Sequence, residues 1–257
     1  MTSTASLANL LADPDQNVRI RAAMELGISP DPAAAPVLVD ALGPELDSRV
    51  RGMITWATVQ HADEALDSLL ALVQDEDPAV RHQVLHVLSK IGGPQILPYV
   101  LPAVADEDPQ VAIKAYRAAA NTFAPEAVPV LVARLGDGDA EQRDQLNRAL
   151  RLLGAWPVEP LAEALGSPDP AVRVHAADAL AEIGSPDAEP AVIALARAVE
   201  DPEDDVRLAA VCALGELDDE DSAEVLRQTA SGAEALLSAV AGRLLAAREA
   251  RAAAAQE

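Results

Sequence analysis

The feature that most constrains this chain is a short motif that returns about every 31 residues. A Val-Arg pair, or a variant of it, begins at residues 18, 50, 80, 111, 142, 172 and 206, with separations of 32, 30, 31, 31, 30 and 34 residues. Self-similarity at a fixed period of this length predicts a stacked repeat architecture. Three residues before each pair lies an acidic residue: Asp15, Asp47, Asp77, Asp108, Asp139, Asp169 or Glu203.

Each repeat is interpreted as two helices joined by a tight acidic turn, and residues 69–92 show the pattern most clearly. Asp77 is a favourable N-cap, because its carboxylate accepts the free N–H groups of the first turn. Pro78 follows at the first helical position, where proline loses no hydrogen bond. The next apolar residues recur at helical spacing, so the unit is a two-helix hairpin. Glycines are interpreted as helix stops in four repeats: Gly27, Gly92, Gly154 and Gly184.

One such hairpin cannot bury its own apolar face, so consecutive hairpins are expected to stack on a continuous core. We therefore predict an all-α fold, a right-handed α-α superhelix (alpha solenoid) of about eight hairpins. Because no long linker interrupts the repeats, we expect a single domain over residues 1–257. The expected hairpins cover residues 4–28, 32–60, 62–92, 94–122, 125–154, 157–184 and 187–217, with a capping hairpin at 219–251 that lacks the Val-Arg pair.

Composition narrows the possible functions. A net charge of −23 argues against general binding to nucleic acid or to a membrane surface, because phosphates require a cationic protein surface. No apolar stretch approaches the ~20 residues of a membrane span, and the N-terminus lacks the basic region of a signal peptide. Cys212 is the only cysteine, so no intramolecular disulfide exists. We expect a soluble cytoplasmic protein, and the arginine-rich, lysine-poor usage is typical of a bacterium with a GC-rich genome.

Residues 169–184 read Asp-Pro-Ala-Val-Arg-Val-His-Ala-Ala-Asp-Ala-Leu-Ala-Glu-Ile-Gly. With a period near 31, this pattern resembles the short HEAT-like repeats first associated with phycobilisome lyases. The resemblance covers about residues 7–217, and the signatures of ankyrin and tetratricopeptide repeats are absent. It implies eight HEAT-like hairpins whose second helices line a concave face, and a use that is mostly the binding of other macromolecules.

On this resemblance, the variable positions of the second helices form the candidate binding surface. Its first third is apolar, its middle is basic, and its last third is acidic, with Asp178, Glu182 and Glu216. An exposed tryptophan and methionine beside a basic groove suit a peptide with an apolar anchor and acidic residues. The predicted partner-binding residues are Met24 and Trp56 as anchors, with His82, His86, Lys90, Lys114, Arg117 and Arg148 as charge partners.

The arginines of the Val-Arg pairs are interpreted as scaffold rather than as an anion-binding row. Each is expected to pair with the acidic caps of its own or a neighbouring turn, in partly exposed ion pairs that contribute ~0–1 kcal/mol each. The six residues are Arg19, Arg51, Arg81, Arg143, Arg173 and Arg207.

The sequence gives little support for a metal-binding or catalytic function. His82 and His86 lie four residues apart on one helical face and are a weak candidate for a metal pair, because no Glu stands beside either. Deoxyhypusine hydroxylase resembles this chain in fold, but its di-iron centre requires His-Glu dipeptides, and none is present. Alkylpurine DNA glycosylases of HEAT-like fold require a strongly cationic concave face, and the small basic patch of this chain does not meet that requirement. Cys212 has no histidine at nearby helical spacing and is interpreted as a structural thiol.

We therefore predict a non-enzymatic scaffold or adaptor, without a cofactor, that holds an acidic-apolar peptide or protein segment on its concave face. The alternative is a bilin lyase-like or hydroxylase-like enzyme of the same repeat class. A bound chromophore or stoichiometric iron in the purified protein would distinguish that enzyme from the scaffold. An acidic mimic of nucleic acid ranks last, because it rests on net charge alone.

Overall fold

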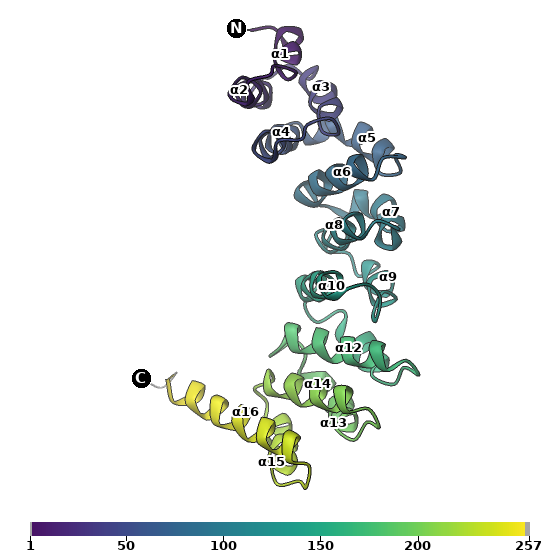
Figure 1. Ribbon diagram of the computed structural model, residues 1–257, viewed down its shortest axis with the longest axis vertical. Coiled ribbons are helices and arrows are strands. Elements are labelled where there is room, and N and C mark those ends of the chain that lie inside the picture. The colour runs from purple at the N-terminus through teal and green to yellow at the C-terminus, as the bar shows by residue number, and fades with distance from the viewer. Residues whose placement is uncertain (1, 255–257) are drawn as a thin grey trace. The chain divides into compact units, whose positions relative to one another are not determined.

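The computed structural model describes residues 2–254, which contain sixteen α-helices, three short 3-10 helices and no strand (Figure 1). The all-α prediction is confirmed. These residues divide into two compact units, one that ends at Ala124 and one that begins at Pro125. The expectation of a single domain stays a prediction. Within residues 2–254, no helix is both long and apolar enough to cross a lipid bilayer.

The first unit contains four hairpins, each made of a shorter first helix and a longer second helix. Its helices are α1 (Thr4–Leu10), α2 (Gln16–Gly27), α3 (Ala34–Asp40), α4 (Ser48–Gln60), α5 (Ala62–Leu72), α6 (Pro78–Ile91), α7 (Leu97–Val100) and α8 (Pro109–Ala120), with 3-10 helices at Pro94–Ile96 and Pro102–Ala105 on either side of α7.

The second unit also contains four hairpins. Its helices are α9 (Ala127–Val132), α10 (Ala140–Leu152), α11 (Val158–Ala164), α12 (Pro170–Ile183), α13 (Val192–Ala198), α14 (Asp204–Gly215), α15 (Glu220–Ala230) and α16 (Ala235–Ala254), with a 3-10 helix at Glu189–Ala191 before α13.

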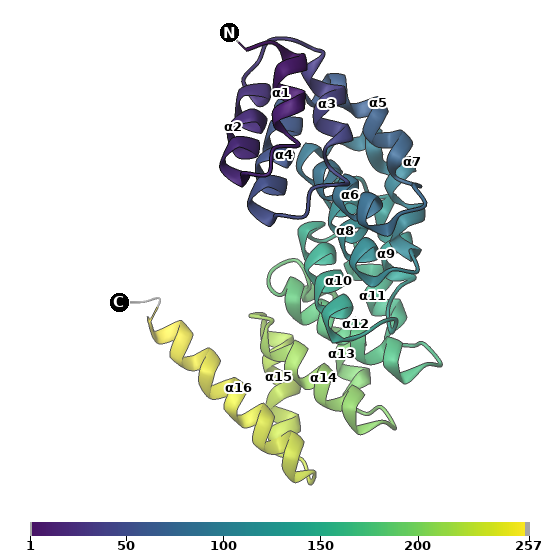
Figure 2. The same cartoon turned by 45° about the horizontal axis from the view of Figure 1, so that its top comes forward.

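In each unit the second helices stack side by side in one layer and the first helices form the other. In the first unit, α4 packs between α2 and α6, and α6 also packs on α8 (Figure 2). In the second unit, α12 and α14 pack together between α10 and α16. The core between the layers consists of small aliphatic side chains, such as the fully buried Leu26, Leu88 and Leu150. Alanine and leucine fill this space because the helices lie close together.

The first helix of the fourth hairpin is broken into three short pieces. Pro94, Pro98 and Pro102 follow one another at four-residue intervals. Each proline lacks the backbone N–H that the helical hydrogen bond requires. Only α7, four residues long, remains α-helical between the two 3-10 segments.

The acidic caps of the second helices are present in six of the seven repeats. In each of these six, the aspartate side chain accepts a backbone N–H from the first turn, and Asp139 forms a full capping box with Gln142. The expectation is wrong for Glu203, which occupies the cap position but makes no capping hydrogen bond. Its side chain is one methylene longer than aspartate, and two acidic residues, Asp204 and Asp205, stand in the first turn instead.

In four repeats, the residue twelve positions after the start of the Val-Arg pair has a left-handed backbone with positive φ. Glycine supplies it at Gly92, Gly154 and Gly184, with φ of 67°, 63° and 65°. The fourth repeat has Phe123 there, with φ of 49° and 62% of its surface exposed. A bulky L-residue in this region is strained, because its Cβ crowds the following carbonyl.

Replacing Phe123 with glycine is therefore expected to stabilise the protein by about 0.5–1 kcal/mol. The relief of backbone strain exceeds the extra entropy of glycine in the unfolded chain, and little apolar surface is lost because the ring is exposed. Urea unfolding followed by circular dichroism measures the change. Phe123→Ala is the matched control, since it removes the ring but keeps the strain. Equal loss of stability in both variants would show that the ring itself stabilises the fold.

Four of the six Val-Arg arginines form ion pairs with the following repeat. In the best formed of these, Nε and Nη2 of Arg173 donate to the two carboxylate oxygens of Asp201, each over 2.8 Å. Nη1 of the same arginine donates to two carbonyls of its own turn. The four pairs are Arg19–Glu45 at 2.7 Å, Arg81–Asp106 at 2.8 Å, Arg173–Asp201 at 2.8 Å and Arg207–Glu234 at 3.2 Å.

The acidic partner differs from the expected one. In three of the four pairs it lies two residues before the N-cap and not at the cap itself: Glu45, Asp106 and Asp201. Each of these carboxylates also accepts the backbone N–H of the cap residue of its own turn. For Arg19 and Arg81, the capping aspartate of the facing turn is engaged with its own helix, and the arginine pairs with the acid two residues before it.

Candidate functional site

The apolar part of the predicted surface lies on α2 and α4 of the first unit. Met24 and Trp56 have 42% and 40% of their surface exposed, and Ile28 is more exposed still. The indole of Trp56 packs over Gly27, where an added Cβ would lie 2.7 Å from Cζ3 of the ring and 2.9 Å from Cα of Ala57. The absence of a side chain at Gly27 lets the Trp56 ring lie close against α2.

This contact corrects the interpretation of Gly27 as a helix stop. Gly27 is the last residue of α2 and is not among the glycines of the described chain with positive φ, so its backbone does not require glycine. What requires glycine is the close approach of α4 and its indole. Gly92, Gly154 and Gly184 do have the left-handed backbone of a helix stop.

The basic part of the surface is a cluster on α6 and α8 of the same unit. We call it the cation cluster: His82, His86, Lys90, Lys114 and Arg117. Burial, together with the charges of Lys114, Lys90 and Arg117, lowers the pKa of His86 to about 4. Burial and the charges of Lys114 and Arg51 likewise lower the pKa of His82, which Asp108 partly opposes. The other four side chains of the cluster therefore lie within electrostatic reach of His86. That they form a binding site stays a prediction.

His86 was expected to be a charge partner, but its imidazole is neutral at neutral pH because its pKa lies far below 7. In the free protein it supplies hydrogen bonds rather than charge. The positive charge of the cluster comes from the two lysines and from Arg117.

Sequence reasoning missed Arg51, which it assigned to the scaffold. Arg51 donates to the carbonyls of Glu45 and Leu46, and no ion pair joins it to an acid in the described chain. Its charge instead lowers the pKa of His82, so it lies beside the cation cluster. Within residues 2–254, Lys90 and Arg117 also make no ion pair. The cluster therefore holds positive charge that the described chain leaves partly uncompensated.

The cluster is poorly suited to a metal ion. Across the described residues, no group of three or more His, Cys, Asp or Glu side chains is arranged to hold one. Lys114, Lys90 and Arg117 surround His86 and repel a divalent cation. The pair His82 and His86 would have to bind the metal with two ligands against this charge.

Arg148, the last predicted contributor, belongs to the second unit. It is exposed on α10, where Nη2 pairs with Asp144 at 3.1 Å. Of the acidic residues expected on this unit, Asp178 and Glu216 are exposed on the second-helix layer, and Glu182 pairs with Arg151 at 2.9 Å.

His175 is a structural residue of the second unit. Its ring is 1% exposed, Nδ1 accepts the backbone N–H of Gly136 at 3.0 Å, and Nε2 lies 3.3 Å from the carbonyl of Arg143. Because Nδ1 accepts, the neutral ring carries its proton on Nε2 and donates it to that carbonyl. Burial lowers the pKa of His175 to about 4.

Cys212, which we interpreted as a structural thiol, lies at the protein surface. It is exposed on α14 and lines a pocket of about 540 Å³ with Asp178 and Arg143. Burial against the pocket wall raises its pKa, as do the charges of Asp178 and Glu216. The thiol is therefore protonated at neutral pH, which argues against a nucleophilic role.

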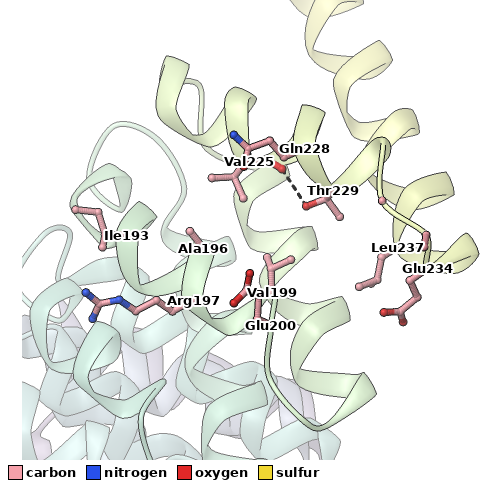
Figure 3. Close-up of a pocket in the computed structure, with 12 residues that line it drawn as sticks. Ile193, Ala196, Arg197, Val199, Glu200, Val225, Gln228, Thr229, Glu234 and Leu237 are labelled. Carbon is pink, nitrogen blue, oxygen red and sulfur yellow. Dashed lines mark hydrogen bonds between the residues drawn. The ribbon is translucent and has the colours of Figure 1, made fainter.

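A further pocket, of about 570 Å³, lies between α13, α15 and the start of α16 (Figure 3). Ile193 and Arg197 lie on one side of it, and Glu234 and Leu237 lie on the other. The Thr229 hydroxyl donates to the carbonyl of Val225 at 2.9 Å, and Glu234 pairs with Arg207. This pocket was not predicted from the sequence. Ile193, which lines it, is a large apolar residue with 69% of its surface exposed.

Comparison with known proteins supports the fold. The HEAT repeat family pattern matches residues 2–59, 47–106, 66–151 and 158–246. The chain therefore belongs to the HEAT repeat family, as its period and motifs predict. No curated protein matches it.

Several solved structures are similar to this chain at low sequence identity. A chain in the structure of Kap95p with RanGDP is 12% identical with a TM-score of 0.63; the match covers 95% of this chain and 40% of that one. The CpcE–CpcF complex of phycocyanin lyase from Nostoc sp. is 18% identical with a TM-score of 0.44, over 96% and 95% of the two chains. Human deoxyhypusine hydroxylase is 21% identical with a TM-score of 0.41, over 96% of both.

Proposed function

We propose that this HEAT repeat protein is a non-enzymatic scaffold that holds an acidic-apolar segment of another protein on its second-helix layer. The observation that carries the proposal is the cation cluster, whose charge the described chain leaves partly uncompensated although the protein as a whole has a net charge of −23. Uncompensated charge of one sign selects partners of the opposite sign.

The neighbouring apolar side chains supply the second part of the specificity. Trp56 presents a ring that Gly27 holds in place, and Met24 lies exposed on the adjacent helix. Interaction hot spots are enriched in tryptophan and arginine, and both residue types occur on this surface. A segment with an apolar residue on Trp56 and acidic residues over α6 and α8 would satisfy both features. Arg148, on the second unit, stays a separate prediction.

A synthetic peptide with an acidic half and a leucine-rich half tests the proposal. In a Trp156→Phe background, Trp56 is the only tryptophan, so its emission reports binding to this surface. We expect a shift with this peptide and none with a peptide in which lysine replaces each acid. The affinity should fall as salt is added, because exposed charges are screened.

Lys90→Glu combined with Arg117→Glu should abolish the shift while leaving the far-ultraviolet circular dichroism unchanged. The matched control is Arg197→Glu with Arg243→Glu, which changes the net charge equally at exposed positions on α13 and α16. Undiminished binding in the first variant would overturn the proposal. A separate Arg148→Glu variant decides whether the second unit contributes.

A further inference from the structure

The pocket that Cys212 lines also contains Arg143, one of the six arginines of the Val-Arg pairs. The pocket lies between α10, α12 and α14 of the second unit, and its volume of about 540 Å³ is in the range of small-molecule sites. Arg143 borders it from α10, Asp178 from α12 and Asp205 from α14. Val174 and Leu208 supply apolar surface.

Arg143, like Arg51, lacks the carboxylate that the other four Val-Arg arginines find in the next turn. The position two residues before the cap is Ser167 in that turn, and its hydroxyl accepts the backbone N–H of Asp169 at 3.2 Å. Nη1 of Arg143 donates to the carbonyl of Gly138 at 2.9 Å, and no acid of the described chain pairs with the guanidinium. Nε and Nη2, which bind the acid in Arg173, are left for another acceptor.

Asp178 is the complementary group. It makes no hydrogen bond or ion pair within residues 2–254, and burial against the pocket raises its pKa. The charge of Arg143 opposes this effect, so the two groups attract each other without forming an ion pair. Because the Arg143 guanidinium and the Asp178 carboxylate border one pocket without contact, a single ligand between them can bind both.

We propose that this pocket binds a small zwitterion, an α-amino acid with an apolar side chain. Its carboxylate lies on the guanidinium of Arg143, its ammonium lies on Asp178 with Asp205 nearby, and its side chain packs on Val174 and Leu208. A ligand with only a carboxylate would be repelled by the two aspartates, and a ligand with only an amine would be repelled by Arg143. Only a molecule that carries both charges satisfies both groups.

Cys212 provides the measurement, because it lines the pocket and is the only cysteine of the chain. The probe is L-leucine, and the readout is the rate at which iodoacetamide alkylates the full-length protein. We expect leucine at twice its Kd to slow alkylation about threefold by occupying the pocket. N-acetylleucine and leucine amide, which each lack one charge, should not slow it at the same concentration.

Two variants test the assigned contacts. Arg143→Gln and Asp178→Asn should each abolish the protection by leucine, while Arg227→Gln, on exposed α15, should retain it. Asp178→Asn should also raise the basal rate, because the carboxylate raises the pKa of the Cys212 thiol, so each protein is compared with its own rate without leucine. Circular dichroism checks the fold. No protection in the native protein at high millimolar leucine, or equal protection in Arg143→Gln, would overturn the proposal.

Discussion

Gly27→Leu is expected to destabilise the protein by about 3 kcal/mol and to move the Trp56 ring into water. The new side chain would begin 2.7 Å from the indole and 2.9 Å from the backbone of Ala57. The ring can rotate away, but the Ala57 Cα belongs to α4, so α2 and α4 must separate. Urea unfolding measures the loss of stability, and a red shift of Trp56 emission in the Trp156→Phe background reports the displaced ring.

Gly52→Ala is the matched control. Gly52 lies in the same helix as Trp56, and an added Cβ would meet nothing within 4 Å. Alanine is a better helix former than glycine, so this change should stabilise the protein by about 0.5–1 kcal/mol. An unfolding midpoint for Gly27→Leu equal to that of the native protein would mean that Trp56 does not rest on Gly27.

Acidification from pH 7 to pH 5 is expected to remove about 2 kcal/mol of stability through His175. The unfolded imidazole takes up a proton near its ordinary pKa of 6.5, whereas the folded one stays neutral until its pKa of about 4. Protons therefore bind the unfolded state preferentially in this window, and stability falls as the pH falls. The physical cause is the burial of the ring, and a proton on Nδ1 would in addition face the N–H of Gly136.

His175→Gln separates this contribution from the rest. The variant loses a ring contact and should be less stable at pH 7, but its free energy of unfolding should change less between pH 7 and pH 5. His82 and His86 titrate in both proteins, so their contributions cancel in the comparison. The same pH dependence in variant and native protein would contradict the assignment to His175.

Much of the fold was predictable, because a repeat reports the same local structure several times. The caps and the amphipathic second helices depend on residues within one turn of each other, which sequence spacing describes directly. Glu203 failed as a cap because one additional methylene changes where a carboxylate reaches. The row of arginine ion pairs was anticipated, but its acceptors were not, since spacing does not tell which of two nearby acids lies within reach of the guanidinium.

The exposure of some candidate residues was predictable, whereas their role as a binding site stays a prediction. Helical periodicity placed Met24 and Trp56 on the solvent side, and both are exposed. The neutral state of His86 could not be predicted, because it depends on burial and on charges from a second helix. The contact between Gly27 and Trp56 joins residues from different repeats, so no local sequence pattern predicts it.

The arginine row also gives the repeats a direction. In all four pairs the guanidinium comes from one hairpin and the carboxylate from the next, never the reverse. The hairpin of α15 and α16 accepts Arg207 on Glu234 but carries no Val-Arg pair of its own. Where such a pair joins two neighbouring hairpins, the first presents the donor edge and the second the acceptor edge, so an inverted order of those two hairpins would leave unmatched edges facing each other.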